Sequence, residues 1–234
     1  MLGFNKNLRT ERISTFHWKQ INGDLKKLYI RLFTLIHDNN IGHVGTSASA
    51  LGVLYAIFKN RMNKDDIFIL SSGHAALAYY VILEYMYGID ALMLYKKHGV
   101  HPHRDEENKI YCSTGSLGMG ISVATGRAMI NKNRKVHVLI SDGEAAEGIV
   151  WESLKTIHEN GVQNINVYVN VNGVSAYKVL DVDYLCNRLM SFLPDERLEL
   201  FFTSVNLTET FKGLDSHYKN LDDDTFNDLM YKLQ

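Results

Sequence analysis

Residues 136–177 read VHVLISDGEAAEGIVWESLKTIHENGVQNINVYVNVNGVSAY, and this stretch decides the fold. Its first five residues are apolar except for one histidine, which predicts a strand buried in a parallel sheet. A helix is expected over residues 147–160, and Gly161 occupies the position where glycine commonly follows a helix end. A second buried strand is expected over residues 165–170. Together these elements form a βαβ unit, which predicts an α/β protein with a mostly parallel sheet.

This βαβ unit brings an aspartate and an asparagine to one edge of the sheet. Asp142 directly follows the first strand, and Asn172 follows the second strand about thirty residues later. Ligands of open α/β sheets bind at the carboxyl ends of the strands, so we expect these two side chains to lie close together. Their oxygen atoms suit a hard cation such as Mg²⁺ or Ca²⁺, which often completes its shell with phosphate oxygens. The pair therefore predicts a metal site that holds a diphosphate ligand.

The spacing of Asp-Gly and Asn resembles the thiamine diphosphate motif, and its form here resembles the version found in transketolases. The shared positions are Glu144, the pair Glu147-Gly148 and the pair Trp151-Glu152, whereas Ser141 stands where the family has glycine. The resemblance implies the three-layer α/β/α thiamine diphosphate-binding fold, with thiamine diphosphate as the cofactor. A nucleotide-binding Rossmann protein would instead need a GxGxxG motif directly after a strand, and the sequence has none.

The same resemblance assigns roles to residues at this edge. Asp142, Asn172 and a backbone carbonyl at Val174 would bind the metal. The expected cofactor-binding residues are Gly115, Ser116, Leu117, Gly118, Asp142, Gly143, Glu144 and Asn172. Glu147 and Glu152 are expected to face inward on their helix and to lie at an interface between subunits. A solvated, ion-pairing role is the alternative for these two glutamates.

A second motif, STGSLGMGISVATGRAM at residues 113–129, matches the transketolase pattern TGxLGxGxxxAxGxA. Gly115 and Gly118 would let the backbone approach the cofactor, and Leu117 would pack against a ring. The small residues Gly120, Ala124 and Ala128 are expected to let a neighbouring helix pack closely.

Four histidines are candidate catalytic residues: His43, His74, His101 and His217. Each lies in a segment that resembles a transketolase segment, although Val44 and Ser216 replace the proline and tryptophan of that family. Histidine suits proton transfer because its pKa is close to neutrality. A short buried strand is expected over residues 65–70, which places His74 at a strand-to-helix junction. The alternative for His43 and His74 is a structural hydrogen bond. Thr46 or Ser47 is expected to cap the helix that follows His43.

His98, His101 and His103 could also be interpreted as a zinc cluster. Three histidines in one charged loop, without a cysteine or carboxylate at a characteristic spacing, are a weak signal for zinc. We expect His98 and His103 to be solvated loop residues or to contact the acceptor substrate.

Size and composition limit the remaining classes of function. The chain has 234 residues, a formal net charge of −1 and two cysteines. One domain over residues 1–234 is expected, with no charge pattern for nucleic acid or an anionic membrane and no disulfide framework. Signal-peptide and membrane-spanning patterns are absent from the sequence, so we expect a cytoplasmic protein. After residue 177 the sequence departs from the transketolase pattern, and its C-terminal third is expected to be shorter than in that family.

The resemblance implies the N-terminal subunit of a split transketolase. Such an enzyme transfers a two-carbon ketol unit from a ketose donor to an aldose acceptor, and specialised sugar biosynthesis would fit the shortened C-terminal third. In this family a glutamate of a pyrimidine-binding domain activates the cofactor, and this chain is too short to contain that domain. We therefore expect a separate C-terminal subunit, in an α2β2 assembly. The alternatives are a 2-oxo acid decarboxylase and carboligase, similar to 1-deoxyxylulose-5-phosphate synthases, or a non-catalytic paralogue that only binds a partner.

Overall fold

The computed structural model describes residues 13–15, 21, 23–175, 178–204 and 220–234. Within these ranges the chain forms one five-stranded sheet in the order β1-β5-β4-β3-β2, and every neighbouring pair of strands is parallel. The strands are β1 (Ile13–Thr15), β2 (Ile67–Leu70), β3 (Val136–Ser141), β4 (Ile165–Val171) and β5 (Leu198–Phe202). The predicted α/β architecture with a parallel sheet is therefore confirmed.

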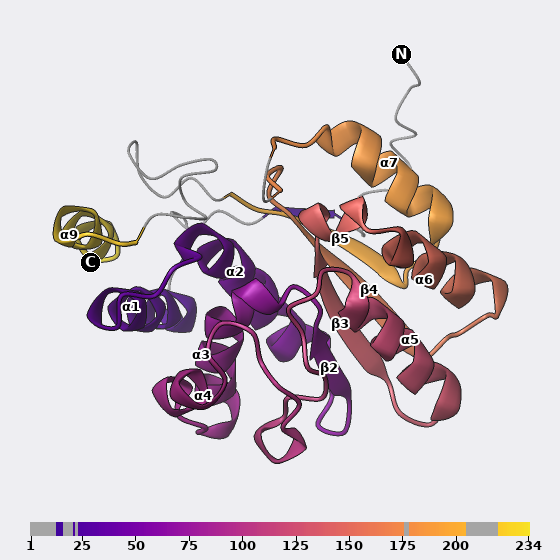
Figure 1. Cartoon of the computed structure of the whole chain (residues 1–234), viewed down its shortest axis with the longest axis horizontal. Coiled ribbons are helices and arrows are strands. Elements are labelled where there is room, and N and C mark those ends of the chain that lie inside the picture. The colour runs from indigo at the N-terminus through magenta and orange to yellow at the C-terminus, as the bar shows by residue number, and fades with distance from the viewer. Residues whose placement is uncertain (1–12, 16–20, 22, 176–177, 205–219) are drawn as a thin grey trace.

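Helices cover both faces of this sheet and give a three-layer arrangement (Figure 1). One layer contains α1 (Gly23–Asp38), α2 (Val44–Asn60), α3 (Ala76–Tyr87), α4 (Ala91–His98) and α9 (Asp223–Lys232). The other contains α5 (Met119–Ile130), α6 (Gly148–Glu159) and α7 (Val182–Phe192). The short 3₁₀ helices are η3 (Gly73–Ala75), η4 (Glu106–Asn108) and η5 (Asp142–Ala146).

Two separate hydrophobic cores receive side chains from the strands, because successive side chains point to opposite faces of a sheet. Phe68 and Leu139 belong to the core that includes α1 to α4, whereas Ile69 and Val138 belong to the core that includes α5 to α7. The buried runs predicted for these strands are thus explained by helices on both sides.

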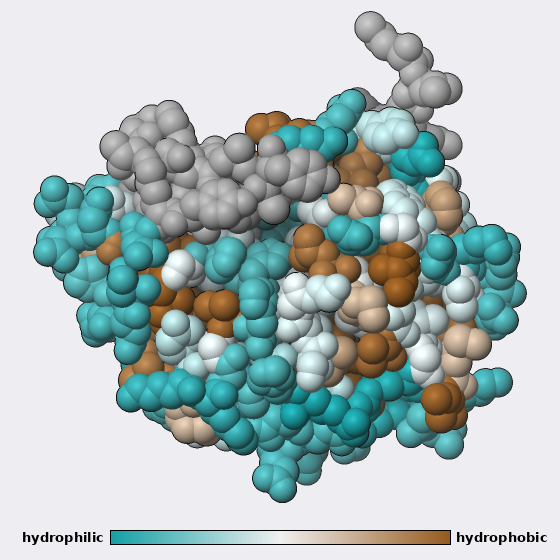
Figure 2. All heavy atoms as spheres, in the orientation of Figure 1, coloured by the Kyte–Doolittle hydropathy of each residue, from teal (hydrophilic) through white to brown (hydrophobic). Residues whose placement is uncertain are grey.

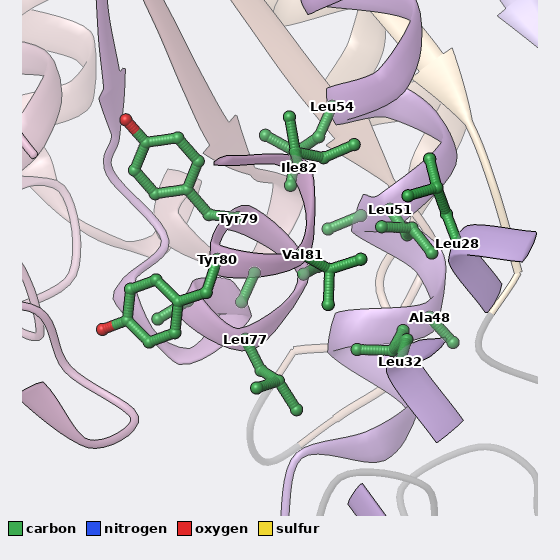
Figure 3. Close-up of a cluster of buried hydrophobic side chains, with 14 of the residues drawn as sticks. Leu28, Leu32, Ala48, Leu51, Leu54, Leu77, Tyr79, Tyr80, Val81 and Ile82 are labelled. Atoms are coloured by element: carbon green, nitrogen blue, oxygen red, sulfur yellow. The ribbon is translucent and has the colours of Figure 1, made fainter. Parts of the chain in front are cut away.

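The helix α3 lies at the centre of the first core. All of its residues from Ala76 to Leu83 are buried, so this part of the helix has no polar face. Figure 3 shows Leu77 and Val81 of α3 beside Leu51 of α2 and Leu32 of α1. Because η3 leads directly into this buried helix, the packing of α3 fixes the position of η3.

The start of α2 differs from the prediction. His43 is the N-cap residue, has a left-handed backbone conformation with φ of 58°, and makes no capping hydrogen bond through its side chain. Thr46 and Ser47 lie inside the helix and are buried, so the expectation that either one caps it was wrong. Because the left-handed residue His43 precedes the helix, α2 begins at Val44, earlier than a cap at Thr46 or Ser47 would predict.

Gly120 also has a different neighbour from the one expected. A Cβ atom on this residue would lie 2.5 Å from the Cα atom of Ser71, immediately after β2. Position 120 therefore requires glycine because α5 begins against the end of the sheet, and not because a second helix packs there.

None of the helices in the described ranges has the combination of length and apolar character needed to cross a membrane. Cys112 and Cys186 form no disulfide bond.

Candidate functional site

Asp142 lies at the carboxyl edge of the sheet, where η5 begins directly after β3. Its Oδ2 atom accepts hydrogen bonds from the backbone amides of Asn172 (2.9 Å) and Gly173 (2.6 Å), and Oδ1 accepts one from Gly143 (2.9 Å). These bonds join the ends of β3 and β4, as the βαβ interpretation predicted. Burial raises the pKa of Asp142 to about 7, although the three amides act in the opposite direction.

The donor set at this position suits a divalent cation. Within the described residues, Asp142 forms no ion pair, so its buried carboxylate is compensated only by backbone amides. The Oδ1 atom of Asn172 accepts a hydrogen bond from the backbone amide of Val174 (3.0 Å), so these two predicted metal ligands share one turn, and the amide of Asn172 bonds to Asp142. Carboxylate, amide and carbonyl oxygens are the ligands that hard cations prefer. The residues present therefore fit the predicted metal.

Glu144 is fully buried and links three segments around the site. Its Oε1 atom accepts hydrogen bonds from the hydroxyl of Ser71 (2.6 Å) and the amide of Gly118 (2.8 Å), and Oε2 accepts one from the amide of Ser141 (2.8 Å). With the hydroxyl of Ser141, it also forms a capping box at the start of η5. Burial raises the pKa of Glu144, against the effect of these hydrogen bonds. Its geometry is that of a residue that positions the backbone at this edge.

The two glycines of the second motif have different surroundings. Gly115 is exposed and lies against His101, since a Cβ atom on Gly115 would be 3.3 Å from the ring of that histidine. Gly118 is buried with φ of 78°, and a Cβ atom on it would lie 2.8 Å from the side chain of Ile149. Glycine at position 118 is thus required by packing against α6. Between them, Ser116 is exposed and Leu117 is partly buried.

Three of the four predicted histidines, His43, His74 and His101, come together near the end of β2 and the start of α2. The rings of His43 and His74 lie 5.9 Å apart, and His74 occupies η3, the strand-to-helix junction that the sequence predicted. The Nδ1 atom of His43 is buried and has no hydrogen-bond partner among the described residues. Burial, helped by the nearby His101, lowers the pKa of His43. His217 lies outside the described residues.

His98 is not solvated, which corrects one expectation. Its side chain is 4% exposed, and Nε2 lies 3.1 Å from the carboxylate of Asp105. This contact holds the end of α4 against the following loop. The ring of His103 lies 6.5 Å from that of His98. Among the described residues, no three histidine, cysteine, aspartate or glutamate side chains are grouped closely enough to hold a metal ion.

Glu147 and Glu152 also differ from the expectation, because both are exposed and neither faces inward. The buried face of α6 consists of Val150, Ser153, Leu154 and Ile157, so the two glutamates lie on the other side of the helix. Figure 2 shows hydrophobic side chains at the surface over the area that α5 and α6 occupy in Figure 1. The exposed hydrophobic residues of α5 are Met119, Val123, Met129 and Ile130.

A pocket of about 720 Å³ opens beside Asp142, between η5, α6 and α7. Its walls include Trp151, Leu180, Tyr184 and Arg188. The indole nitrogen of Trp151 donates a hydrogen bond to the carbonyl of Ala145 (3.0 Å), which fixes the ring at the pocket. No sequence pattern indicated this pocket, because it depends on the separation of two helices.

Sequence reasoning also missed Ser71 and Thr114. Ser71 donates the hydrogen bond that joins Glu144 to the end of β2. The Oγ1 atom of Thr114 is buried, has no partner among the described residues, and would lie 3.0 Å from a Cβ atom on Gly73. A hydroxyl residue at each of these strand and loop ends was the available signal, but only the structure shows that Ser71 bonds to Glu144 and that Thr114 is left without a partner among the described residues.

The fold and the arrangement of Asp142 and Asn172 agree with the resemblance of the sequence to a transketolase-type domain. The chain belongs to this family, since the family described as transketolase, thiamine diphosphate binding domain, matches residues 26–182.

Two relatives are named as subunits of an apulose-4-phosphate transketolase. The relative from Actinobacillus succinogenes is 32% identical over 184 residues, which cover 70% of this chain and 65% of that protein. The relative from Phocaeicola vulgatus is 32% identical over 210 residues, covering 79% and 74%. A solved transketolase from Leishmania mexicana superposes with a TM-score of 0.68 at 18% identity, over 91% of this chain and 42% of that one. That structural likeness confirms the fold.

Proposed function

We propose that this chain is the diphosphate-binding subunit of a split transketolase, a transferase that works only together with a pyrimidine-binding subunit. The observation that carries the proposal is the buried Asp142, which lies beside Asn172 at the carboxyl edge of the sheet. The names of the two relatives, which describe each as one subunit of its enzyme, support a division between two chains.

Asp142, Asn172 and the carbonyl of Val174 would hold Mg²⁺ or Ca²⁺, and the cation would bind the diphosphate of the cofactor. Thiamine diphosphate supplies an electron sink for breaking and forming carbon–carbon bonds. Glu144 holds β2, β3 and the start of α5 in register around that position.

The histidines would bind the sugars and transfer protons. His43 has a lowered pKa because its ring is partly buried, so it is neutral near pH 7 and can accept a proton. His101 and Gly73, the residue before His74, both lie close to Gly115. This arrangement suits hydroxyl and carbonyl groups of a sugar. His217 is proposed as a fourth member of the set.

The partner subunit would cover the outer side of α5 and α6. Met119, Val123 and Ile130 expose hydrophobic surface on α5, with Ile130 88% exposed, and Glu147 and Glu152 lie on the exposed side of the neighbouring α6. A contiguous apolar area with polar residues beside it is typical of an interaction surface. We propose that this surface contacts the subunit that carries the activating glutamate, in an α2β2 assembly.

The substrates would be sugars, with a ketose as the donor and an aldose as the acceptor. The relatives' names make a ketose phosphate the first donor to test.

The test is reconstitution of this chain with a chain that carries the pyrimidine-binding domain, followed by an assay of ketol transfer. We expect activity with a ketose phosphate only when both chains, thiamine diphosphate and a divalent cation are present. Turnover of pyruvate instead of a ketose would favour the decarboxylase alternative. A stable complex that binds no cofactor and turns over neither donor would contradict the proposal and favour a non-catalytic role.

A further inference from the structure

The pocket between α6 and α7 has features that the proposed catalysis leaves without a role. Aromatic side chains form much of its wall, namely Trp151, Tyr184 and Phe192, and two cations, Lys178 and Arg188, line it as well. Its volume of about 720 Å³ lies in the range of pockets that hold small molecules.

Arg188 is held in place but keeps most of its donors available. Its guanidinium lies over the rings of Tyr184 (5.2 Å) and Trp151 (5.9 Å), and Nη1 donates a hydrogen bond to the hydroxyl of Tyr184 (2.7 Å). Among the described residues it forms no ion pair with a carboxylate. A guanidinium has five N–H donors in a fixed plane that matches the oxygens of phosphate. Arg188 is thus oriented for an anion that the described part of the chain does not provide.

The two carboxylates that line the pocket already accept hydrogen bonds from backbone amides and form no ion pair with Arg188. Asp142 accepts hydrogen bonds from three backbone amides, as described above. Asp181 is the N-cap of α7, and its Oδ1 atom accepts a hydrogen bond from the amide of Tyr184 (3.0 Å). Because both carboxylates are directed toward backbone amides, neither pairs with Arg188, and its guanidinium can bind an anionic ligand in the pocket.

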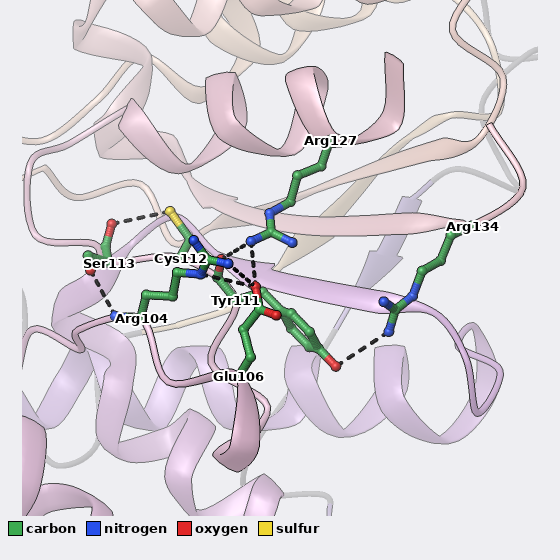
Figure 4. Close-up of polar contacts among 7 residues, drawn as sticks. All are labelled: Arg104, Glu106, Tyr111, Cys112, Ser113, Arg127 and Arg134. Atoms are coloured by element: carbon green, nitrogen blue, oxygen red, sulfur yellow. Dashed lines mark hydrogen bonds and ion pairs between the residues drawn. The ribbon is translucent and has the colours of Figure 1, made fainter. Parts of the chain in front are cut away.

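Three arginines outside this pocket provide a comparison, and two of them pair with a carboxylate. Figure 4 shows Arg104 and Arg127 converging on Glu106, while Arg134 lies by the ring of Tyr111. Arg134 is 5.5 Å from that ring and donates through Nε to the carbonyl of Asp65 (2.5 Å). Arg134 therefore resembles Arg188 in its aromatic contact, but it lies outside the pocket beside Asp142.

We propose that the α6–α7 pocket binds a phosphorylated sugar, with the phosphate on Arg188 and the sugar body against Trp151 and Tyr184. The choice of a sugar rests on the proposed function, whereas the phosphate site rests on the pocket and on Arg188. Aromatic rings offer an apolar face to the C–H groups of a sugar, and the hydroxyl of Tyr184 and the carboxylate of Asp181 can bond its hydroxyl groups.

The test is calorimetric titration of the full chain with ribose 5-phosphate, and separately with ribose. The variants are Arg188→Met, Arg188→Lys and the matched control Arg134→Met, each first checked for folding by circular dichroism. We expect the wild type and Arg134→Met to bind ribose 5-phosphate. The affinity of Arg188→Met should be lower by a factor of about ten or more. Arg188→Lys should retain part of the affinity, because it keeps the charge but loses the planar fork. Ribose should bind much more weakly than its phosphate.

Absence of ribose 5-phosphate binding to the folded wild type would overturn the inference, and so would equal affinity in Arg188→Met. Thiamine diphosphate and Mg²⁺, titrated into each of these proteins after reconstitution with the chain that carries the pyrimidine-binding domain, separate this result from the proposed function. All Arg188 variants should bind the cofactor as the wild type does, because Arg188 is not among the proposed cofactor ligands. If the cofactor binds to none of these samples, the result counts against the proposed function. The measured binding of ribose 5-phosphate to the pocket would remain valid in that case.

Discussion

Two neighbouring regions at the carboxyl edge of the sheet differ in whether their buried polar atoms have hydrogen-bond partners. Around Glu144, each carboxylate oxygen accepts at least one hydrogen bond from Ser71, Gly118 or Ser141. Around the histidines, the Nδ1 atom of His43 and the Oγ1 atom of Thr114 are buried without a partner among the described residues. Buried polar atoms in folded proteins are nearly always bonded, so the second region is the one that awaits a ligand. The first region is a support, and substitutions in the two regions should therefore act on different properties.

The largest expected effect on stability is that of Glu144→Ala. This substitution leaves the hydroxyl of Ser71 and the amides of Gly118 and Ser141 without their acceptor. We expect the free energy of unfolding to fall by about 3 kcal/mol, measured by urea denaturation of the chain.

The matched control is Glu159→Ala, which removes an exposed carboxylate that pairs with Lys155 on the same helix. Exposed pairs of this kind contribute about 0.3–0.5 kcal/mol. Equal destabilisation by the two substitutions would contradict the supporting role of Glu144.

A smaller effect is expected for Gly118→Ala, again in the supporting region. The positive φ of 78° and the 2.8 Å approach to Ile149 should together cost about 2 kcal/mol. Gly126, in the interior of α5, is the control because no atom lies within 4 Å of a Cβ placed on it. Gly126→Ala should stabilise the chain by about 0.5–1 kcal/mol, since alanine is the better helix former. Thermal unfolding of both variants checks these opposite signs.

The smallest effect on stability is expected in the histidine region, for His43→Asn. Asparagine tolerates the left-handed backbone at this position and is a good N-cap residue, so the free energy of unfolding should change by less than about 1 kcal/mol. The kcat/KM of the reconstituted enzyme should nevertheless fall by about 100-fold or more, because a proton-transferring group is lost. Full activity in this variant would show that the unbonded nitrogen has no catalytic role, and the contrast between the two regions would fail.

The sequence predicted the sheet, the βαβ unit and the meeting of Asp142 with Asn172, because these follow from apolar runs and from the direction of parallel strands. The limits of the βαβ unit were placed within a few residues: the helix expected over residues 147–160 spans Gly148–Glu159, and the strand expected over residues 165–170 spans Ile165–Val171. The same reasoning placed His74 at the junction after β2. Local patterns therefore determine which side chains reach this edge.

Other features depend on contacts between distant segments and could not be predicted. The role of Glu144 in cofactor binding stays a prediction, but its hydrogen bonds to Ser71, Gly118 and Ser141 were not anticipated. His98 was expected in solvent, yet it pairs with Asp105. Glu147 and Glu152 were expected to face inward, whereas the hydrophobic residues of α6 turn the helix so that both are exposed. In each case the partner or the buried face was decided by tertiary packing.

The central claim is that Asp142 and its neighbours hold a metal-bound diphosphate, and calorimetric titration with thiamine diphosphate tests it most directly. The reconstituted complex would be titrated with and without Mg²⁺, using the wild type and Asp142→Asn, with circular dichroism to verify that the variant is folded. We predict tight, Mg²⁺-dependent binding to the wild type and a loss of about 100-fold or more in affinity for the variant. Equal binding to both proteins, or binding to the wild type that does not change when Mg²⁺ is removed, would contradict the account.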